Sequence, residues 1–249
     1  MKRLLLCGAA LAVLLDAGSA MAADMAVKAP VMAPAAFSWT GFYVGGNVGG
    51  TWADDPSTYV GAVAAVATTF TVDMRAQSVI GGLQIGGNWQ TGMLVLGAEA
   101  DFDGRDLNFP AMGVNTTFIR EDVSQREGWL GTARGRIGLA EGRALFYVTG
   151  GLAYGEVEHS FEKTYPLAGV SLGASDSTVR AGWTAGGGIE YALWKNLIVG
   201  AEYLHVDLGT TELTVPSLMR VGVVGTASFV DRSDIVRVRV DWLFGAPVM

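Results

Sequence analysis

The chain has 249 residues and a formal net charge of −7, and an acidic protein is not attracted to the phosphate backbone, so the charge excludes a nucleic-acid partner held in that way. Half of the residues are apolar, only 16% are charged and 35 are glycine, yet no apolar stretch is long enough for a transmembrane helix. This combination is unusual for a soluble acidic protein and typical of a membrane β-barrel, in which every second residue of a strand faces lipid.

The first residues have the layout of a secretory signal peptide. Lys2 and Arg3 precede the apolar run Leu4–Leu15, and small residues follow as far as Ala22. The apolar run is shorter than the roughly 20 residues that a membrane-spanning helix needs. We therefore predict a signal peptide at 1–22 that is cleaved after Ala22 and takes the only cysteine, Cys7, with it. The mature chain then has no disulfide.

A short linker follows the predicted cleavage site. Residues 23–36 contain Pro30 and Pro34 among alanines and valines, which favours an extended periplasmic linker. No second stretch of this kind occurs farther along the chain. We therefore predict one domain at 37–249.

Eight segments of this domain alternate between apolar and polar residues with a period of two, the period of a β-strand. The last is the clearest, because Val236, Val238 and Val240 fall on one face and Arg237 and Arg239 on the other. The eight predicted strands are 40–52, 78–89, 93–103, 129–139, 144–156, 178–191, 196–206 and 235–244.

The connections between these segments alternate between long and short. The long connections are 53–77, 104–128, 157–177 and 207–233, and the short ones are 90–92, 140–143 and 192–195. A transmembrane barrel has long outer loops, tight periplasmic turns and both chain ends on the periplasmic side. The fold class predicted is therefore all-β, an eight-stranded antiparallel up-and-down transmembrane β-barrel. The apolar stretch 59–67 in the first long connection is expected to extend the flanking strands as a hairpin, and contact with lipopolysaccharide or a partner is the alternative.

Aromatic residues fall near both ends of the predicted strands, where amphipathic rings sit at the level of lipid headgroups. The expected periplasmic rim is Trp39, Trp89, Phe146, Tyr191, Trp194, Trp242 and Phe244. The expected outer rim is Trp52, Phe102, Trp129, Tyr154 and Tyr203.

Charged residues occupy the faces opposite the apolar ones, so they are expected inside the barrel. Five acidic and five basic side chains form this predicted lumen charge network: Glu99, Asp101, Glu190, Glu202, Asp241, Arg134, Arg136, Arg180, Arg237 and Arg239. Unpaired burial would cost several kcal/mol for each charge, so we expect ion pairs. Adjacent strands suggest Glu99 or Asp101 with Arg134 or Arg136, and Glu202 with Arg237 or Arg239. An eight-stranded barrel is just wide enough for its side chains to fill, which favours a plug over a pore.

The sequence gives little indication of catalysis. It has two histidines, His159 in a predicted outer loop and His205 near the outer end of the seventh strand. Ser228, Ser233, Asp207 and Glu212 are conceivable partners of His205, but their spacing does not indicate a triad. No cysteine–histidine cluster indicates a metal, and the glycine pairs lack the spacing of a phosphate-binding loop. We therefore predict no enzyme activity, no cofactor and no metal.

Three stretches carry a resemblance to a known family. Residues 37–49 (FSWTGFYVGGNVG) resemble the opening strand of the RopB-type outer-membrane proteins, also called the porin-family outer-membrane immunogenic proteins. Residues 147–155 (YVTGGLAYG) and 182–191 (GWTAGGGIEY) look like the fifth and sixth strands of that family. With Glu202-Tyr203 and the closing 237–244, the likeness covers nearly all of 37–244.

The resemblance implies an eight-stranded barrel in the bacterial outer membrane that supports envelope integrity and exposes its loops to the outside. It also implies a C-terminal aromatic signal, here Trp242 and Phe244, that the barrel-assembly machinery recognises during insertion. In this chain Phe244 is followed by five more residues, which departs from the family pattern. The expected partners are outer-membrane lipid and lipopolysaccharide, with a further surface partner possible through the outer loops.

Two alternatives to a structural membrane barrel remain open at this point. A charged lumen also suits a narrow, porin-like channel for small solutes. A secreted, soluble lipocalin-like barrel would need an apolar lumen and a polar outside, which is the inverse of the pattern in 129–139 and 235–244.

Overall fold

The computed structural model describes residues 37–63, 66–112, 120–167, 169–216 and 224–245. The predicted signal peptide, 1–22, and linker, 23–36, lie outside the described residues. The described part contains no helix that is long and apolar enough to cross a membrane. Its eight strands are β1 (Gly41–Val63), β2 (Val66–Thr91), β3 (Leu94–Met112), β4 (Arg120–Glu141), β5 (Ala144–Tyr165), β6 (Val170–Ala192), β7 (Leu197–Pro216) and β8 (Val224–Phe244).

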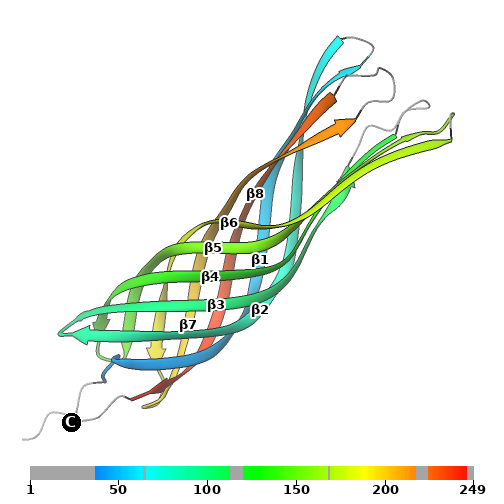
Figure 1. Cartoon of the computed structure of the whole chain (residues 1–249). Coiled ribbons are helices and arrows are strands. Elements are labelled where there is room, and N and C mark those ends of the chain that lie inside the picture. Colours follow the sequence, from blue (N-terminus) through cyan, green and yellow to red (C-terminus); the bar gives the residue numbers. More distant parts are fainter. Residues whose placement is uncertain (1–36, 64–65, 113–119, 168, 217–223, 246–249) are drawn as a thin grey trace, which may run out of the picture. The chain divides into compact units, whose positions relative to one another are not determined.

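The strands form a closed antiparallel barrel in chain order, so the predicted fold class is confirmed (Figure 1). β1 pairs with β2 on one side and with β8 on the other, which closes the barrel. The β1–β8 ladder runs from Phe42–Phe244 to Trp52–Asp234 in the barrel body. We call the end that carries the three short turns the turn end, and the opposite end the hairpin end. Gly92 and Gly142 adopt positive φ in two of the short turns, a conformation that glycine takes without strain.

Side chains alternate between the two faces of the barrel wall as the sequence predicts. Val238 is 55% exposed on the outside, whereas its neighbours Arg237 and Arg239 are each 1% exposed on the inside. An apolar outside and an ionised inside are the reverse of a soluble barrel. The lipid-facing surface is therefore the outer one.

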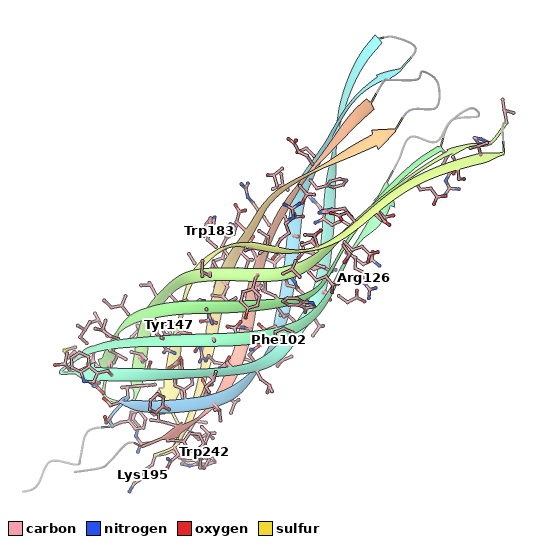
Figure 2. The ribbon with its side chains drawn as sticks, viewed as in Figure 1. Phe102, Arg126, Tyr147, Trp183, Lys195 and Trp242 are labelled. Carbon is pink, nitrogen blue, oxygen red and sulfur yellow. The ribbon has the colours of Figure 1, made fainter. Side chains whose placement is uncertain are left out.

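Aromatic side chains lie on the outside toward both ends of the barrel. Phe102 stacks on Trp129, with 5.3 Å between the ring centroids, and Trp129 meets Tyr154 edge to face. Figure 2 shows Trp242 near the turn end and Trp183 toward the hairpin end. The prediction for Trp39 is wrong, because this ring is fully buried inside the barrel.

Three successive layers fill the lumen of the barrel body. An apolar layer at the turn end consists of Trp39, Tyr43, Val95, Ala140, Leu145, Tyr147, Ala192, Ile198 and Leu243. A second apolar layer lies toward the hairpin end and consists of Ile80, Leu130, Ala153, Val157, Leu204, Val206, Leu208 and Ile235. Along β4, β7 and β8, the inward-facing charges lie between residues of these two layers.

The long connections are mostly strand rather than irregular loop, so their predicted extent is wrong. β1 and β2 stay paired as far as Val63–Val66, which confirms the expected hairpin at 59–67. β5 and β6 likewise remain paired to Tyr165–Val170. Beyond the barrel body, the paired strands continue their ladders, so their backbone N–H and C=O groups still form hydrogen bonds with each other.

The hairpins separate into two groups of four strands. β2 and β3 pair only from Ile80–Arg105 to Thr91–Leu94, and β6 and β7 only from Trp183–Asp207 to Ala192–Ile198. Beyond these points β7, β8, β1 and β2 form one group, and β3 to β6 form the other (Figure 1).

Close approach of strands inside the barrel explains some of the many glycines. A Cβ added to Gly151 of β5 would lie 2.1 Å from the backbone oxygen of Ala133, whereas a Cβ added to Gly135 of β4 would meet nothing within 4 Å.

We expect Gly151→Ala to lower the free energy of unfolding by about 1–3 kcal/mol, because the backbone of β4 must move to admit the methyl group. Gly135→Ala, on the neighbouring strand, is the matched control and should leave stability nearly unchanged. Urea titrations followed by tryptophan fluorescence in detergent micelles measure both. Equal stability of the two variants would contradict the close packing described here.

Candidate functional site: the charged barrel interior

Nine of the ten charges predicted for the lumen are buried inside the barrel. They are Glu99 and Asp101 of β3, Arg134 and Arg136 of β4, Glu190 of β6, Glu202 of β7, and Arg237, Arg239 and Asp241 of β8. The strand register places Glu99 directly across from Arg134, and Glu202 across from Arg237. These strands therefore bring together the pairs that sequence adjacency suggests.

Arg237 lies among three carboxylates. Its Nη1 atom contacts Asp103 at 2.7 Å, and its Nη2 atom contacts Asp101 at 2.9 Å and Glu202 at 2.7 Å. Its Nε also donates a hydrogen bond to Glu202 at 2.9 Å. Every N–H-bearing nitrogen of this guanidinium therefore has a carboxylate partner.

Arg134 shares two of those carboxylates. Its Nη2 atom lies 2.7 Å from Asp101 and 2.5 Å from Glu99, and its Nη1 atom lies 3.0 Å from Glu202. Because Asp101 and Glu202 each contact both Arg134 and Arg237, the network cannot be divided into separate pairs.

The other two arginines extend the network toward the turn end. Arg239 contacts Asp241 at 2.8 Å through Nε and Glu99 through Nη2. Arg136 contacts Glu190 at 2.7 Å and Glu99 at 3.4 Å. Glu99 thus joins three arginines on two strands.

Several neutral side chains complete the network and were not predicted as part of it. The Tyr43 hydroxyl donates to Glu99 at 2.5 Å and the Tyr147 hydroxyl donates to Glu202 at 2.9 Å. The Arg136 guanidinium also lies over the Tyr147 ring, 4.1 Å from its centroid. Tyr43 and Tyr147 have the inward parity of their strands, so the alternation itself was the available signal.

Asp103 is a further charged member that the sequence reasoning missed. It has the same parity as Glu99 and Asp101 on β3 but stands at the last position of the predicted strand. The structure continues β3 to Met112, and Asp103 is fully buried. Asn47 donates to Asp103 at 2.9 Å, and Gln84 donates to Asp241 at 2.5 Å.

Arg180 differs from the prediction, because it does not join this network. The ladder between β6 and β7 ends at Trp183–Asp207, and Arg180 lies beyond that point, where the wall opens. Its side chain is half-buried, and its Nη1 donates to the backbone oxygen of Thr210 at 3.5 Å.

A second polar cluster lies inside the barrel toward the hairpin end. His159, predicted in an outer loop, is a buried residue of β5, with Nε2 3.5 Å from Asp231. Gln125 donates to Asp231 at 2.9 Å, and Arg105 forms an ion pair with Glu127. Burial raises the pKa of the Glu127 carboxyl, whereas the Arg105 guanidinium beside it acts in the opposite direction. These residues lie on long strand extensions that the sequence reasoning treated as loops.

His205 has a different partner from those considered in the sequence. Its Nδ1 lies 2.9 Å from Asp234, which also accepts a hydrogen bond from the Tyr203 hydroxyl at 2.6 Å. Ser233 faces the other way and accepts a hydrogen bond from Arg105 at 2.9 Å. The part of the chain that the structure describes contains no group of metal-ligating side chains.

Trp242 and Phe244, the predicted insertion signal, are half-exposed on the outside of β8 at the turn end. Lys195 lies near the same end (Figure 2). The final residues, 246–249, lie outside the described range.

An eight-stranded barrel with an apolar outside, aromatic rims and an ionised interior is an integral membrane barrel of the bacterial outer membrane. Comparisons with known proteins agree. The sequence matches the family described as outer membrane protein beta-barrel domain over residues 12–237, and the chain belongs to that family. Outer-membrane localisation follows.

Individual relatives are consistent with this assignment. The chain is 38% identical over 205 residues to a 31 kDa outer-membrane immunogenic protein of Brucella melitensis, covering 79% of this chain and 84% of the relative. It is 29% identical over 194 residues to a 22 kDa outer membrane protein of Rhizobium leguminosarum, covering 77% and 74%. Among solved structures, the outer membrane protein OprG from Pseudomonas aeruginosa is similar in fold, with a TM-score of 0.52, 11% identity, and coverage of 86% of this chain and all of that one. The resemblance to outer-membrane immunogenic proteins is thereby confirmed.

Proposed function

We propose that the protein is a structural barrel of the outer membrane, which supports envelope integrity while its lumen is closed by the charge network. The observation that carries this proposal is that the side chains of Arg134, Arg237, Asp101 and Glu202 are all 0% exposed. A water-filled channel would leave such side chains hydrated.

The two apolar layers support the same conclusion. One lies toward the turn end of the charges, with Leu145 and Leu243, and the other toward the hairpin end, with Ile80 and Leu204, so apolar side chains narrow the lumen on both sides of the charges. Moving an ion through such a layer without water is costly. The alternative of a narrow, porin-like channel has the charged lumen in its favour, but it requires a continuous path of water past the packed charges and the apolar side chains.

We expect the purified, folded protein to show no stable open channels in planar-bilayer recordings. Combined replacement of Asp101, Arg134, Glu202 and Arg237 by alanine removes two charges of each sign together with their volume, and should produce stepwise currents. Val238→Ala, on the lipid-facing side, is the control and should stay silent. Stable wild-type currents that change in Arg134→Ala or Arg237→Ala would favour the channel instead.

The proposal assigns no catalysis to this barrel. The Asp234, His205 and Tyr203 group is the only histidine–carboxylate arrangement on the outside of the described strands, and Ser233, the nearest serine in the chain, points into the lumen. Covalent catalysis needs a nucleophilic side chain within hydrogen-bond reach of the histidine, and Ser233 is not placed to supply it. We propose outer-membrane lipid and lipopolysaccharide as the partners of the outer surface, and the barrel-assembly machinery as the partner during insertion.

A further inference from the structure

The seam between β6 and β7 leaves strand edges without a strand partner. β6 is paired with β5 as far as Val170, and β7 with β8 as far as Pro216. The two strands pair with each other only up to Trp183–Asp207. Within the described ranges, residues 170–182 of β6 therefore use only one of their two hydrogen-bonding edges in a ladder.

A bulge in β7 explains why β6 and β7 separate at this seam. The ladder between β7 and β8 shifts register between Asp207 and Thr210, which marks a bulge. Gly209 within it has a φ of +90°, and its N–H donates to the Asp207 carboxylate at 2.8 Å. A bulge bends its strand and ends the pairing on one side, so β7 turns away from β6 at this point.

The free edge of β6 lacks the usual protection against pairing. Natural edge strands are commonly blocked by proline or lysine, but residues 170–182 contain neither, and Asp176 and Arg180 are their only charges. The facing strand β7 ends in Pro216. The side chains of residues 175–179 are all exposed, so access to this part of the edge is open on both faces of the strand.

One backbone oxygen at the seam already accepts a hydrogen bond from across the gap. The Arg180 Nη1 atom donates to the backbone oxygen of Thr210 on β7 at 3.5 Å. A side chain thus partly satisfies an acceptor that a paired strand would otherwise satisfy.

We propose that this seam, above Trp183, binds an extended peptide segment of another protein by strand addition to the free edge of β6. Main-chain hydrogen bonds supply affinity in this mode of recognition, and the side chains of the edge supply specificity. Because residues 170–182 carry serines, a threonine and glycines with one acidic and one basic residue, and so no net charge, the fitting partner is a weakly charged, β-prone segment with no proline.

A second copy of this chain fits the edge less well. Copies in one membrane share the same orientation, so a two-fold axis relating them runs along the membrane normal. Two β6 strands related by that axis would run parallel, the less stable arrangement. A peptide that is not anchored in the membrane can adopt the antiparallel direction that β7 has in the barrel body.

The test uses the folded, full barrel in lipid nanodiscs and a fluorescent synthetic peptide of residues 207–215 carrying Gly209→Val, which continues the register of β7 without its bulge. Two further peptides carry N-methyl groups on alternate amides, one at odd and one at even positions. Only every second amide of an added strand faces its neighbour. We expect binding to fall at least tenfold for one methylated peptide and to persist for the other.

Hydrogen exchange supplies the position of binding. Amides between Ser171 and Ala181 should become protected when the peptide binds, and amides of the β1–β2 hairpin should not. Equal binding of the two methylated peptides, or protection elsewhere, would overturn the proposal. So would dimers of the barrel that protect the same β6 amides without any peptide, because the occupant would then be a second copy.

Discussion

Arg237→Met should destabilise the folded barrel by about 3–5 kcal/mol, because it removes one partner of a buried ionic group and leaves the others charged. The substitution keeps much of the side-chain volume, so the loss reflects charge more than a cavity. Asp101, Asp103 and Glu202 all contact this guanidinium and would lose a positive partner together. The free energy of unfolding from urea titration in phospholipid vesicles measures the effect.

Arg126→Met provides the matched control. Arg126 forms an ion pair with Asp106 at 2.9 Å, but the two side chains are 57% and 64% exposed. Solvent screens such a pair, and its loss should leave unfolding almost unchanged. If Arg237→Met were as stable as Arg126→Met, the interior charges would have to be hydrated, which would argue for an open lumen.

Val238→Arg should destabilise the barrel by about 2–4 kcal/mol, because a guanidinium at the middle of the lipid-facing side must lie in hydrocarbon. Val238 stands between Arg237 and Arg239, so the chain already carries arginine on either side of this position. The expected loss therefore depends on the face of the wall and not on the local sequence. Unfolding in phospholipid vesicles and the mobility of unboiled samples on detergent gels report it.

Ser175→Arg is the corresponding control on the β5–β6 hairpin, where the side chain is exposed beyond the barrel body. It should unfold like the wild type. A tolerated Val238→Arg would show that this face is in water, and the inside-out assignment of the wall would fail.

The sequence predicted the barrel well because alternation is a local property. One residue in two along β8 must be apolar to face lipid, and the arginines between them have no other place than the lumen. The same parity assigns Glu99 and Arg134 to the interior. The two strands are neighbours in the chain, so adjacency suggests the pair, but a long connection joins β3 to β4 and alternation alone does not fix their register.

The extent of the strands was harder to predict. Residues beyond the membrane gain nothing from strict alternation, because water surrounds the wall there, so the hairpin extensions resemble loops in sequence. His159 was therefore misplaced, and Arg180 was assigned to a lumen that does not enclose it. The seam depends on a bulge at Gly209, and a single glycine among 35 gives no sign of that role.

The sharing of carboxylates in the lumen also limits how the interior can change over time. A single replacement at Arg134 or Glu202 leaves several unmatched charges, whereas a concerted exchange of the whole group for apolar residues of similar volume would cost little. Variants with only one of these charges replaced are expected to be less stable than either the present network or a fully apolar interior. We therefore expect exchanges of one apolar residue for another on the outside to be tolerated, whereas any single change among the interior charges should destabilise the barrel.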